Sequence, residues 1–192
     1  MTCSRRRATA LNHRIRSADC RVHFFRWCHA SGDLRGFLTQ MAWQWHIPSA
    51  ALAESPFIRK VSDEDDERRE PIDAQPYFDE SLITLVDVGG ADEAELYVRL
   101  AADLDGGEAM ALAIATQRGW TLATDDRKAK RLAGDLGVSV ITTPELMQRW
   151  AKASKMRPAR LRNLLSNIES GARFAPGEDA PGYEWWTAQV GI

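Results

Sequence analysis

The sequence lacks several features that would place it in a common class of protein. No apolar run approaches the ~20 residues needed to span a bilayer, and neither a G-x-G-x-x-G nor a Walker loop is present to hold a nucleotide phosphate. No serine lies in a G-x-S-x-G turn, and the four histidines match no metal template. We therefore expect a soluble, cytoplasmic protein without a membrane contact, and neither a nucleotide-binding protein nor a serine hydrolase.

Cysteine is scarce, with only Cys3, Cys20 and Cys28, all near the N-terminus. Their spacing matches no zinc site and does not favour a disulfide framework. We place none of them in the core.

Charge is distributed unevenly along the 192 residues, a length that suits one domain with a tail. Residues 1–31 hold seven arginines against one acid, Asp19, which leaves 18 basic and 26 acidic residues elsewhere, a formal charge of −8. An acidic domain is not the usual footprint of tight nucleic-acid binding. Bound metal ions can nevertheless supply the positive charge that meets a phosphate.

The second half of the chain has the clearest periodicity. A turn signal, DGG, precedes a strongly apolar helix over 108–118. Residues 120–123 and 138–141 have the pattern of short strands, with an amphipathic helix over 127–136 between them. Strands joined by helices of this length predict right-handed crossovers and a parallel sheet, so the fold class is α/β.

Acidic residues follow the strand ends of this pattern. Glu108, Asp125 and Asp126 all fall near junctions where a strand ends or a helix begins, which is where ligand sites form in parallel sheets. Carboxylates gathered there would repel one another unless cations shared them, and Mg²⁺ or Mn²⁺ would suit such oxygen ligands. Taken singly, each acid is better explained as a helix cap that complements the helix dipole than as a metal ligand.

The order of these features resembles the C-terminal half of a PIN domain. The resemblance rests on Gly-Glu-Ala opening an alanine-rich helix, a strand ending Ala-Thr-Asp-Asp-Arg, a second helix, Leu-Gly-Val and a last strand, over residues 104–150. IPSAALAE at 47–54 looks like the strand and helix that carry the family's early glutamate. The resemblance implies a three-layer α/β/α domain with a mostly parallel sheet. It also implies binding of Mg²⁺ or Mn²⁺ and cleavage of single-stranded RNA, often as the toxin of a toxin–antitoxin pair.

Carried over residue by residue, the resemblance gives Glu54, Glu108 and Asp126 as metal ligands and catalytic residues, with Asp125 as a further ligand. Thr124 and Arg127 would contact the substrate. A metal held there would lower the pKa of a water and neutralise the phosphodiester during in-line attack, so no side-chain nucleophile is required. The alternative for Arg127 is a solvated residue in the first turn of a helix.

The N-terminal segment departs from the family's pattern. PIN domains begin with an apolar strand that ends in an aspartate ligand, whereas RVHFFRWC at 21–28 contains no acid. Either Asp19, which lies upstream, reaches the site in another register, or the first ligand is gone. Residues 1–31 otherwise show no convincing period, which leaves a basic arm that touches RNA, a targeting segment or a segment outside the fold.

These patterns divide the chain into an atypical basic segment over 1–31, a PIN-like domain over 32–151 and a C-terminal helical extension over 152–192. The charge run VSDEDDERRE at 61–70 predicts a solvated excursion. In the extension, an apolar face that contains Leu161, Leu165 and Ile168 predicts packing on the domain or on a second copy, as in a homodimer. Its arginines and tryptophans could instead stack on RNA.

Two classes of function remain open at this point. The first is a metal-dependent ribonuclease, with an antitoxin protein as a partner. The second is a PIN-fold protein without nuclease activity that binds RNA or a protein. An unrelated receiver-like α/β domain is disfavoured because no acidic pair follows a first strand.

Overall fold

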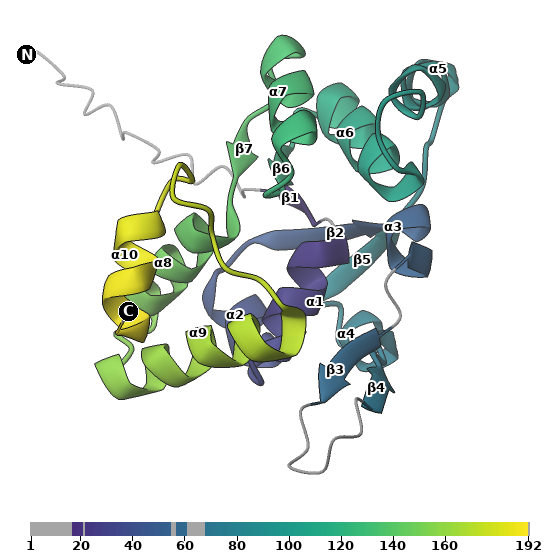
Figure 1. Ribbon diagram of the computed structural model, residues 1–192. Helices are drawn as coiled ribbons and strands as arrows, with labels where there is room; N and C mark the ends of the chain where they lie inside the picture. The colour runs from purple at the N-terminus through teal and green to yellow at the C-terminus, as the bar shows by residue number, and fades with distance from the viewer. Residues whose placement is uncertain (1–16, 21, 55–56, 61–67, 192) are drawn as a thin grey trace, which may run out of the picture.

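A parallel sheet runs through the middle of the molecule (Figure 1). The computed structural model describes residues 17–191 except 21, 55–56 and 61–67. In the five-stranded sheet the order is β5-β2-β1-β6-β7, and every neighbouring pair is parallel. The strands are β1 (Ser17–Cys20), β2 (Gln44–Pro48), β5 (Ile83–Val86), β6 (Thr121–Ala123) and β7 (Val140–Ile141). This sheet confirms the predicted α/β class.

Helices cover both faces of the sheet and produce two apolar cores. The helices α5 (Ala91–Leu100), α6 (Gly106–Arg118) and α7 (Arg127–Asp135) form one core with β6. The other core takes residues from α1 (Val22–Ala30), α2 (Leu34–Gln40), α8 (Thr143–Ala153), α9 (Pro158–Ala172) and α10 (Tyr183–Val190). The neighbours Leu122 and Ala123 of β6 enter different cores, because successive side chains of a strand point to opposite faces. The predicted three-layer α/β/α arrangement is therefore present.

Helix α6 lies at the centre of one layer, as its composition predicts. Every residue from Ala109 to Ala115 is buried. Gly119 ends the helix with a left-handed φ of 65°, a conformation that glycine adopts without steric cost. The small side chains let α6 pack closely on α3 (Ser49–Glu54), α5 and the sheet. None of the helices in the described part of the chain combines the length and apolarity needed to cross a bilayer.

The structure corrects the prediction for the N-terminal segment. Residues 17–30, which we placed outside the domain, form the central strand β1 and the helix α1, with residue 21 outside the description. Residues 22–28 of the RVHFFRWC segment therefore belong to a helix and not to the first strand. Phe25 and Cys28 are three positions apart and both buried, so one face of a helix enters the core. Residues 1–16 lie outside the described part.

Cys28 corrects a second expectation, because its side chain is fully buried in the core. Burial raises the pKa of this thiol well above its ordinary value, so it remains protonated and behaves as a small apolar side chain.

The middle of the chain agrees with the pattern in outline. The strand and helix expected over 47–54 are the end of β2 and α3, and α2 precedes them. The short helix α4 (Gln75–Asp79) precedes β5. Part of the charge run is more regular than we expected, because β4 (Arg68–Pro71) pairs antiparallel with β3 (Phe57–Lys60). Residues 61–67 of that run are outside the described residues.

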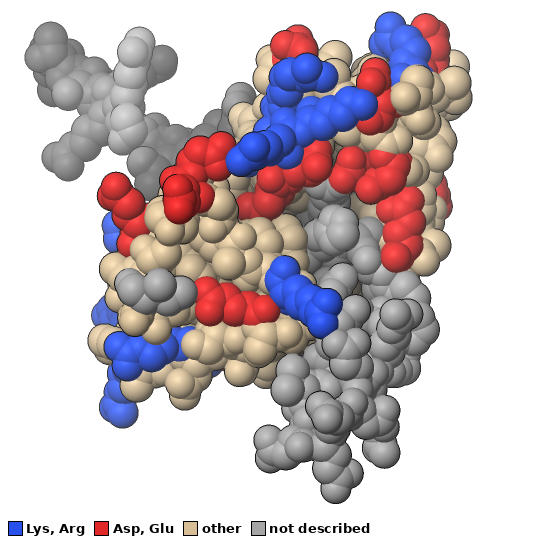
Figure 2. Space-filling view, viewed as in Figure 1, with Lys and Arg blue, Asp and Glu red and all other residues tan. Residues whose placement is uncertain are grey.

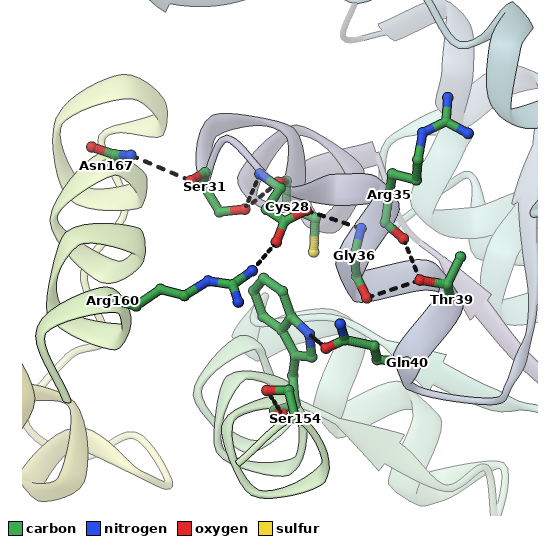
Figure 3. A network of polar contacts seen from close by, with 11 residues as sticks. Cys28, Ser31, Arg35, Gly36, Thr39, Gln40, Ser154, Arg160 and Asn167 are labelled. Atoms are coloured by element: carbon green, nitrogen blue, oxygen red, sulfur yellow. Dashed lines mark hydrogen bonds and ion pairs between the residues drawn. The ribbon is translucent and has the colours of Figure 1, made fainter. Parts of the chain in front are cut away.

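The C-terminal extension packs on the rest of the chain. Leu165, Ile168 and Trp186 are at most 1% exposed, and α9 contacts α1 and α10. Figure 3 shows polar contacts at this junction: Arg160 of α9 pairs with Asp33, and the side chain of Asn167 donates to the carbonyl of Ser31 at 3.3 Å. The predicted packing of the apolar face is thus intramolecular. The boundary at 151 remains a prediction.

Candidate functional site

The carboxyl ends of the parallel strands share one edge of the sheet, where ligand sites form in such folds. In the strand ladder, Asp19 of β1 pairs with His46 of β2 and with Leu122 of β6. Thr124 follows β6 directly and is 1% exposed. An aspartate is therefore present near the end of the central strand, at residue 19, in the upstream register that the sequence left open. The side chain of Asp19 lies outside the described residues.

Glu54, at the end of α3, is joined to the first turn of α6. The backbone N–H of Gly107 donates to Glu54 Oε1 at 2.8 Å. A Cβ on Gly107 would meet Glu54 Oε2 at 2.5 Å and the Cα of Ala51 at 2.8 Å, so this approach requires glycine. Glu108 is the next residue, and the contact therefore brings two of the three predicted catalytic acids to neighbouring positions.

A helix cap and an ion pair lie at the start of α6, and the ion pair joins this region to the start of α7. Asp105 caps α6 by accepting a hydrogen bond from the N–H of Glu108 at 2.8 Å. Two residues earlier, Asp103 Oδ1 lies 2.8 Å from Lys128 Nζ in the first turn of α7. The hydrogen bond from Lys128 lowers the pKa of Asp103. The pair places the helix that follows Asp126 beside the loop that precedes Glu108.

Asp126 is the N-cap of α7. Its Oδ1 accepts from the N–H of Ala129 at 2.7 Å, and its own N–H donates to Thr124 Oγ1 at 3.1 Å. A capping role, the simpler of the two interpretations of this acid, is therefore present. The cap holds only one carboxylate oxygen, so it leaves room for a ligand role. The predicted contact of Thr124 with substrate remains a prediction.

Asp125 has a contact that its sequence context did not indicate. Its carboxylate accepts from the backbone N–H of Thr143 at 3.1 Å and from Thr143 Oγ1 at 2.6 Å. Thr143 is the first residue of α8, and Thr142 before it donates from N and Oγ1 to Glu145 at 2.9 and 2.8 Å. The negative charge of Asp125 thus meets the positive end of a helix dipole.

Arg127 forms an ion pair with the tail. Its Nη2 lies 2.8 and 2.9 Å from the two carboxylate oxygens of Asp179. Both side chains are largely exposed, at 80% and 69%. Sequence reasoning missed this partner because 52 positions separate the two residues and no periodic pattern links them.

The candidate metal ligands are carboxylate oxygens, which suit a hard divalent metal ion. Glu54 and Asp126 each hold one oxygen on a backbone amide, and within the described residues the second oxygen of each has no partner. Carboxylate oxygens are the ligands that Mg²⁺ and Mn²⁺ prefer. Among the described side chains, however, no three histidine, cysteine or acidic residues are arranged to hold a metal ion. The described acids fit the metal by type and do not by themselves complete a site.

Charge of both signs gathers around these residues. Figure 2 shows a band of acidic side chains across the molecule, with Lys and Arg projecting beside it where α7 lies in Figure 1. The basic residues of α7 are Arg127, Lys128, Lys130 and Arg131. An edge with acids for a metal and cations for phosphates suits a polyanionic substrate.

A separate ion pair braces α5 against α6. Arg118 Nε lies 2.7 Å from Glu93 Oε1, Arg118 Nη2 lies 2.8 Å from Glu93 Oε2, and the N–H of Gly89 donates to Glu93 Oε2 at 2.6 Å. The hydrogen bonds from Arg118 lower the pKa of Glu93.

Burial and the nearby Arg118 charge lower the pKa of His46, which stacks on Trp120 with ring centroids 4.0 Å apart.

Comparison with known families agrees with this architecture. A family model described as a PIN domain matches residues 34–177, about three quarters of the chain. The chain therefore belongs to the PIN domain family. The match extends beyond our boundary at 151 and includes α9. A search of curated proteins gave no match.

Proposed function

We propose that this PIN-domain protein is a Mg²⁺- or Mn²⁺-dependent endoribonuclease that hydrolyses phosphodiester bonds of single-stranded RNA. The observation that carries the proposal is the meeting of four elements at one edge of the sheet. Glu54 of α3 binds the start of α6, Lys128 of α7 binds Asp103 before α6, and β1 brings Asp19 between β2 and β6. Family membership supports the same assignment.

Glu54, Glu108 and Asp126 would hold the metal, with Asp125 and Asp19 as further acids of the site. When bound, the ion supplies positive charge that activates a water and neutralises the attacked phosphate. The protein fixes its carboxylates in advance: the amide of Gly107 holds Glu54 and the amide of Ala129 holds Asp126. Carboxylates placed before the substrate arrives require little rearrangement in the transition state.

Substrate contacts come from the cations beside these acids. Arg127 is exposed and one residue from Asp126, so its guanidinium can hold a phosphate of the RNA backbone. Thr124, which is buried, would act by fixing the turn that carries Asp126, since its hydroxyl accepts the N–H of that residue.

A second function, a catalytically inactive PIN fold that binds RNA or a protein, is favoured by a specific observation. Glu54, Asp125 and Asp126 all accept structural hydrogen bonds, and the described acids form no complete metal group. Such a protein would bind its partner equally well with and without a chelator. The two functions are therefore separable by one set of variants.

The test is cleavage of labelled single-stranded RNA by the purified chain with Mn²⁺, with Mg²⁺ and with EDTA. Four isosteric variants remove one acid each: Asp19→Asn, Glu54→Gln, Glu108→Gln and Asp126→Asn. Asp92→Asn is the matched control, because Asp92 is exposed on α5 and changes the net charge equally. We expect each site variant to lose about 100-fold or more in cleavage rate and the control to match the wild type.

Metal-dependent cleavage that survives in all four variants would contradict the proposed site. RNA binding without cleavage, unchanged by EDTA, would support the inactive fold. Retained cleavage in Asp19→Asn alone would limit the site to Glu54, Glu108 and Asp126.

We propose further that the protein acts as the toxin of a toxin–antitoxin pair in the cytoplasm, with an antitoxin protein as partner and a homodimer as its assembly. This role rests on the family resemblance. Growth arrest on induction of the wild type, absent with Asp126→Asn, is the expected result. Light scattering of the purified chain tests the dimer.

A further inference from the structure

A pocket lies between the first turn of α7 and the tail that follows α9. Its lining includes Asp125, Arg127 and Lys130 on one side and, on the other, residues 174–177, 179 and 180 of the tail. The pocket is about 280 Å³ in volume, close to the lower end of the range for small-molecule sites. Arg127 is one residue from Asp126, so the pocket adjoins the proposed catalytic acids.

The tail side of the pocket is firmly anchored. Phe174 packs on Trp27, with ring centroids 4.1 Å apart, and meets Trp186 edge-on at 5.7 Å. Pro176 is buried. A turn follows, in which the N–H of Ala180 donates to the carbonyl of Gly177 at 2.9 Å. These contacts hold in place the segment of the tail that carries Asp179.

The α7 side of the pocket carries two cations in different states. Lys130 is half-buried and has no ion-pair partner among the described residues. Arg127 is paired with Asp179, but that pair is largely exposed, and exposed ion pairs contribute little to stability. A phosphate, with several acceptor oxygens and a full negative charge, can replace a carboxylate on a guanidinium.

Asp125 also lines the pocket and would repel an anion if its charge were unbalanced. Its oxygens accept from the amide and hydroxyl of Thr143, at the positive end of α8. Those contacts direct the carboxylate toward the helix. The cations of α7 therefore determine what the pocket attracts.

We propose that this pocket binds the nucleotide next to the scissile bond of single-stranded RNA, and that its phosphate displaces Asp179 from Arg127. The inference rests on the proposed function and adds a subsite to it. Asp179 is then an internal competitor that weakens RNA binding in the resting protein. Removing its charge should improve binding, an effect opposite to that expected for a residue that contacts substrate.

The experiment measures binding of a labelled single-stranded RNA of mixed sequence to the full chain by fluorescence anisotropy in EDTA, at several salt concentrations. We expect Asp179→Asn to bind about twofold to fivefold more tightly. Arg127→Gln and Lys130→Gln should each bind about threefold to tenfold more weakly, with a salt slope smaller by about 1. Glu178→Gln is the matched control, because this exposed neighbour removes the same charge and does not line the pocket.

Two further measurements separate competition from a general charge effect. In the Arg127→Gln background, Asp179→Asn should give no gain, since the competitor then has no target. In cleavage assays with Mn²⁺, Asp179→Asn should lower KM and leave kcat unchanged, as expected for an interaction that affects ground and transition states equally.

Equal gains in Asp179→Asn and Glu178→Gln would overturn the proposal, as would a full gain in the Arg127→Gln background. Wild-type cleavage of RNA with no effect of any pocket variant would overturn the subsite and leave the nuclease intact. Absence of binding and cleavage in every variant, Asp179→Asn included, would overturn both.

Discussion

Two regions of the candidate site hold their side chains in different ways. In the acidic region, made of Glu54, Asp125 and Asp126, each carboxylate accepts a hydrogen bond from a backbone amide. In the basic region, made of Arg127, Lys128 and Lys130, two cations pair with exposed carboxylates and the third has no such partner among the described residues. Backbone contacts fix the acids before substrate arrives, whereas solvent-exposed pairs exchange readily.

The largest expected effect comes from disturbing the acidic region at Gly107. In Gly107→Ala the new methyl group would meet the Cα of Ala51 at 2.8 Å and Glu54 Oε2 at 2.5 Å, so α3 and α6 must separate. We expect a loss of ~1–3 kcal/mol in the free energy of unfolding and a loss of RNA cleavage. Urea denaturation and the cleavage assay measure the two effects.

Gly134→Ala is the control for that variant, because nothing lies within 4 Å of a Cβ at this position of α7. Alanine favours a helix over glycine by up to about 1 kcal/mol, so this variant should be as stable as the wild type or more so. If both glycine variants unfold alike, close packing at Gly107 does not fix Glu54.

The Glu93–Arg118 pair is an ion pair like those of the basic region, but it is shielded from solvent. Their side chains are 11% and 28% exposed. Glu93→Gln should lose ~1–3 kcal/mol of stability at neutral pH, the usual range for a hydrogen bond to a charged group. Glu95→Gln, on an exposed position of the same helix, should lose nothing measurable.

The pH dependence of that loss has a defined sign. Arg118 lowers the pKa of Glu93 below its ordinary value of 4.5, so the charged carboxylate stabilises the fold above that pH. The stabilisation fades as pH falls through the lower, folded-state pKa. Urea titrations should therefore show wild type and Glu93→Gln converging below about pH 4.5. A constant difference down to lower pH would mean that charge is not the source of the effect.

The smallest effect is expected for Lys128→Gln in the basic region. Lys128 and Asp103 are 44% and 57% exposed, and salt screens such pairs. The unfolding temperature should match that of the wild type at high salt and differ little at low salt. A large loss at high salt would show that this pair holds α7 in place and would remove the difference between the two regions.

The sequence predicts most of the second half of the fold because local signals mark its boundaries. Gly119 ends α6 directly after the helix predicted over 108–118, and α7 lies within the amphipathic pattern predicted over 127–136. The first strand was missed because its four residues have no apolar alternation, and the aromatic run after it suggested a strand where α1 lies. The sequence signal available for a helix was the spacing of the apolar residues Phe25 and Cys28, three positions apart, and the structure buries both.

The candidate site was less predictable than the fold. Pattern and resemblance gave its acids, but a cap and a metal ligand have the same sequence, and Asp126 shows the cap directly. The contacts Asp125–Thr143 and Arg127–Asp179 join distant positions. Such contacts follow from the packing of α8 and the tail, which no local pattern specifies.

The position of β1 has a consequence for how the chain assembles. This strand occupies the middle of the sheet. Its residue Ala18 pairs with Trp45 of β2 on one side and with Thr121 of β6 on the other. During synthesis, β1 gains its first partner early, but its second edge stays open until more than half of the chain has followed. Pairings so far apart in sequence slow folding. A chain that stops before β6 would present an unpaired strand edge, the kind of surface that promotes aggregation.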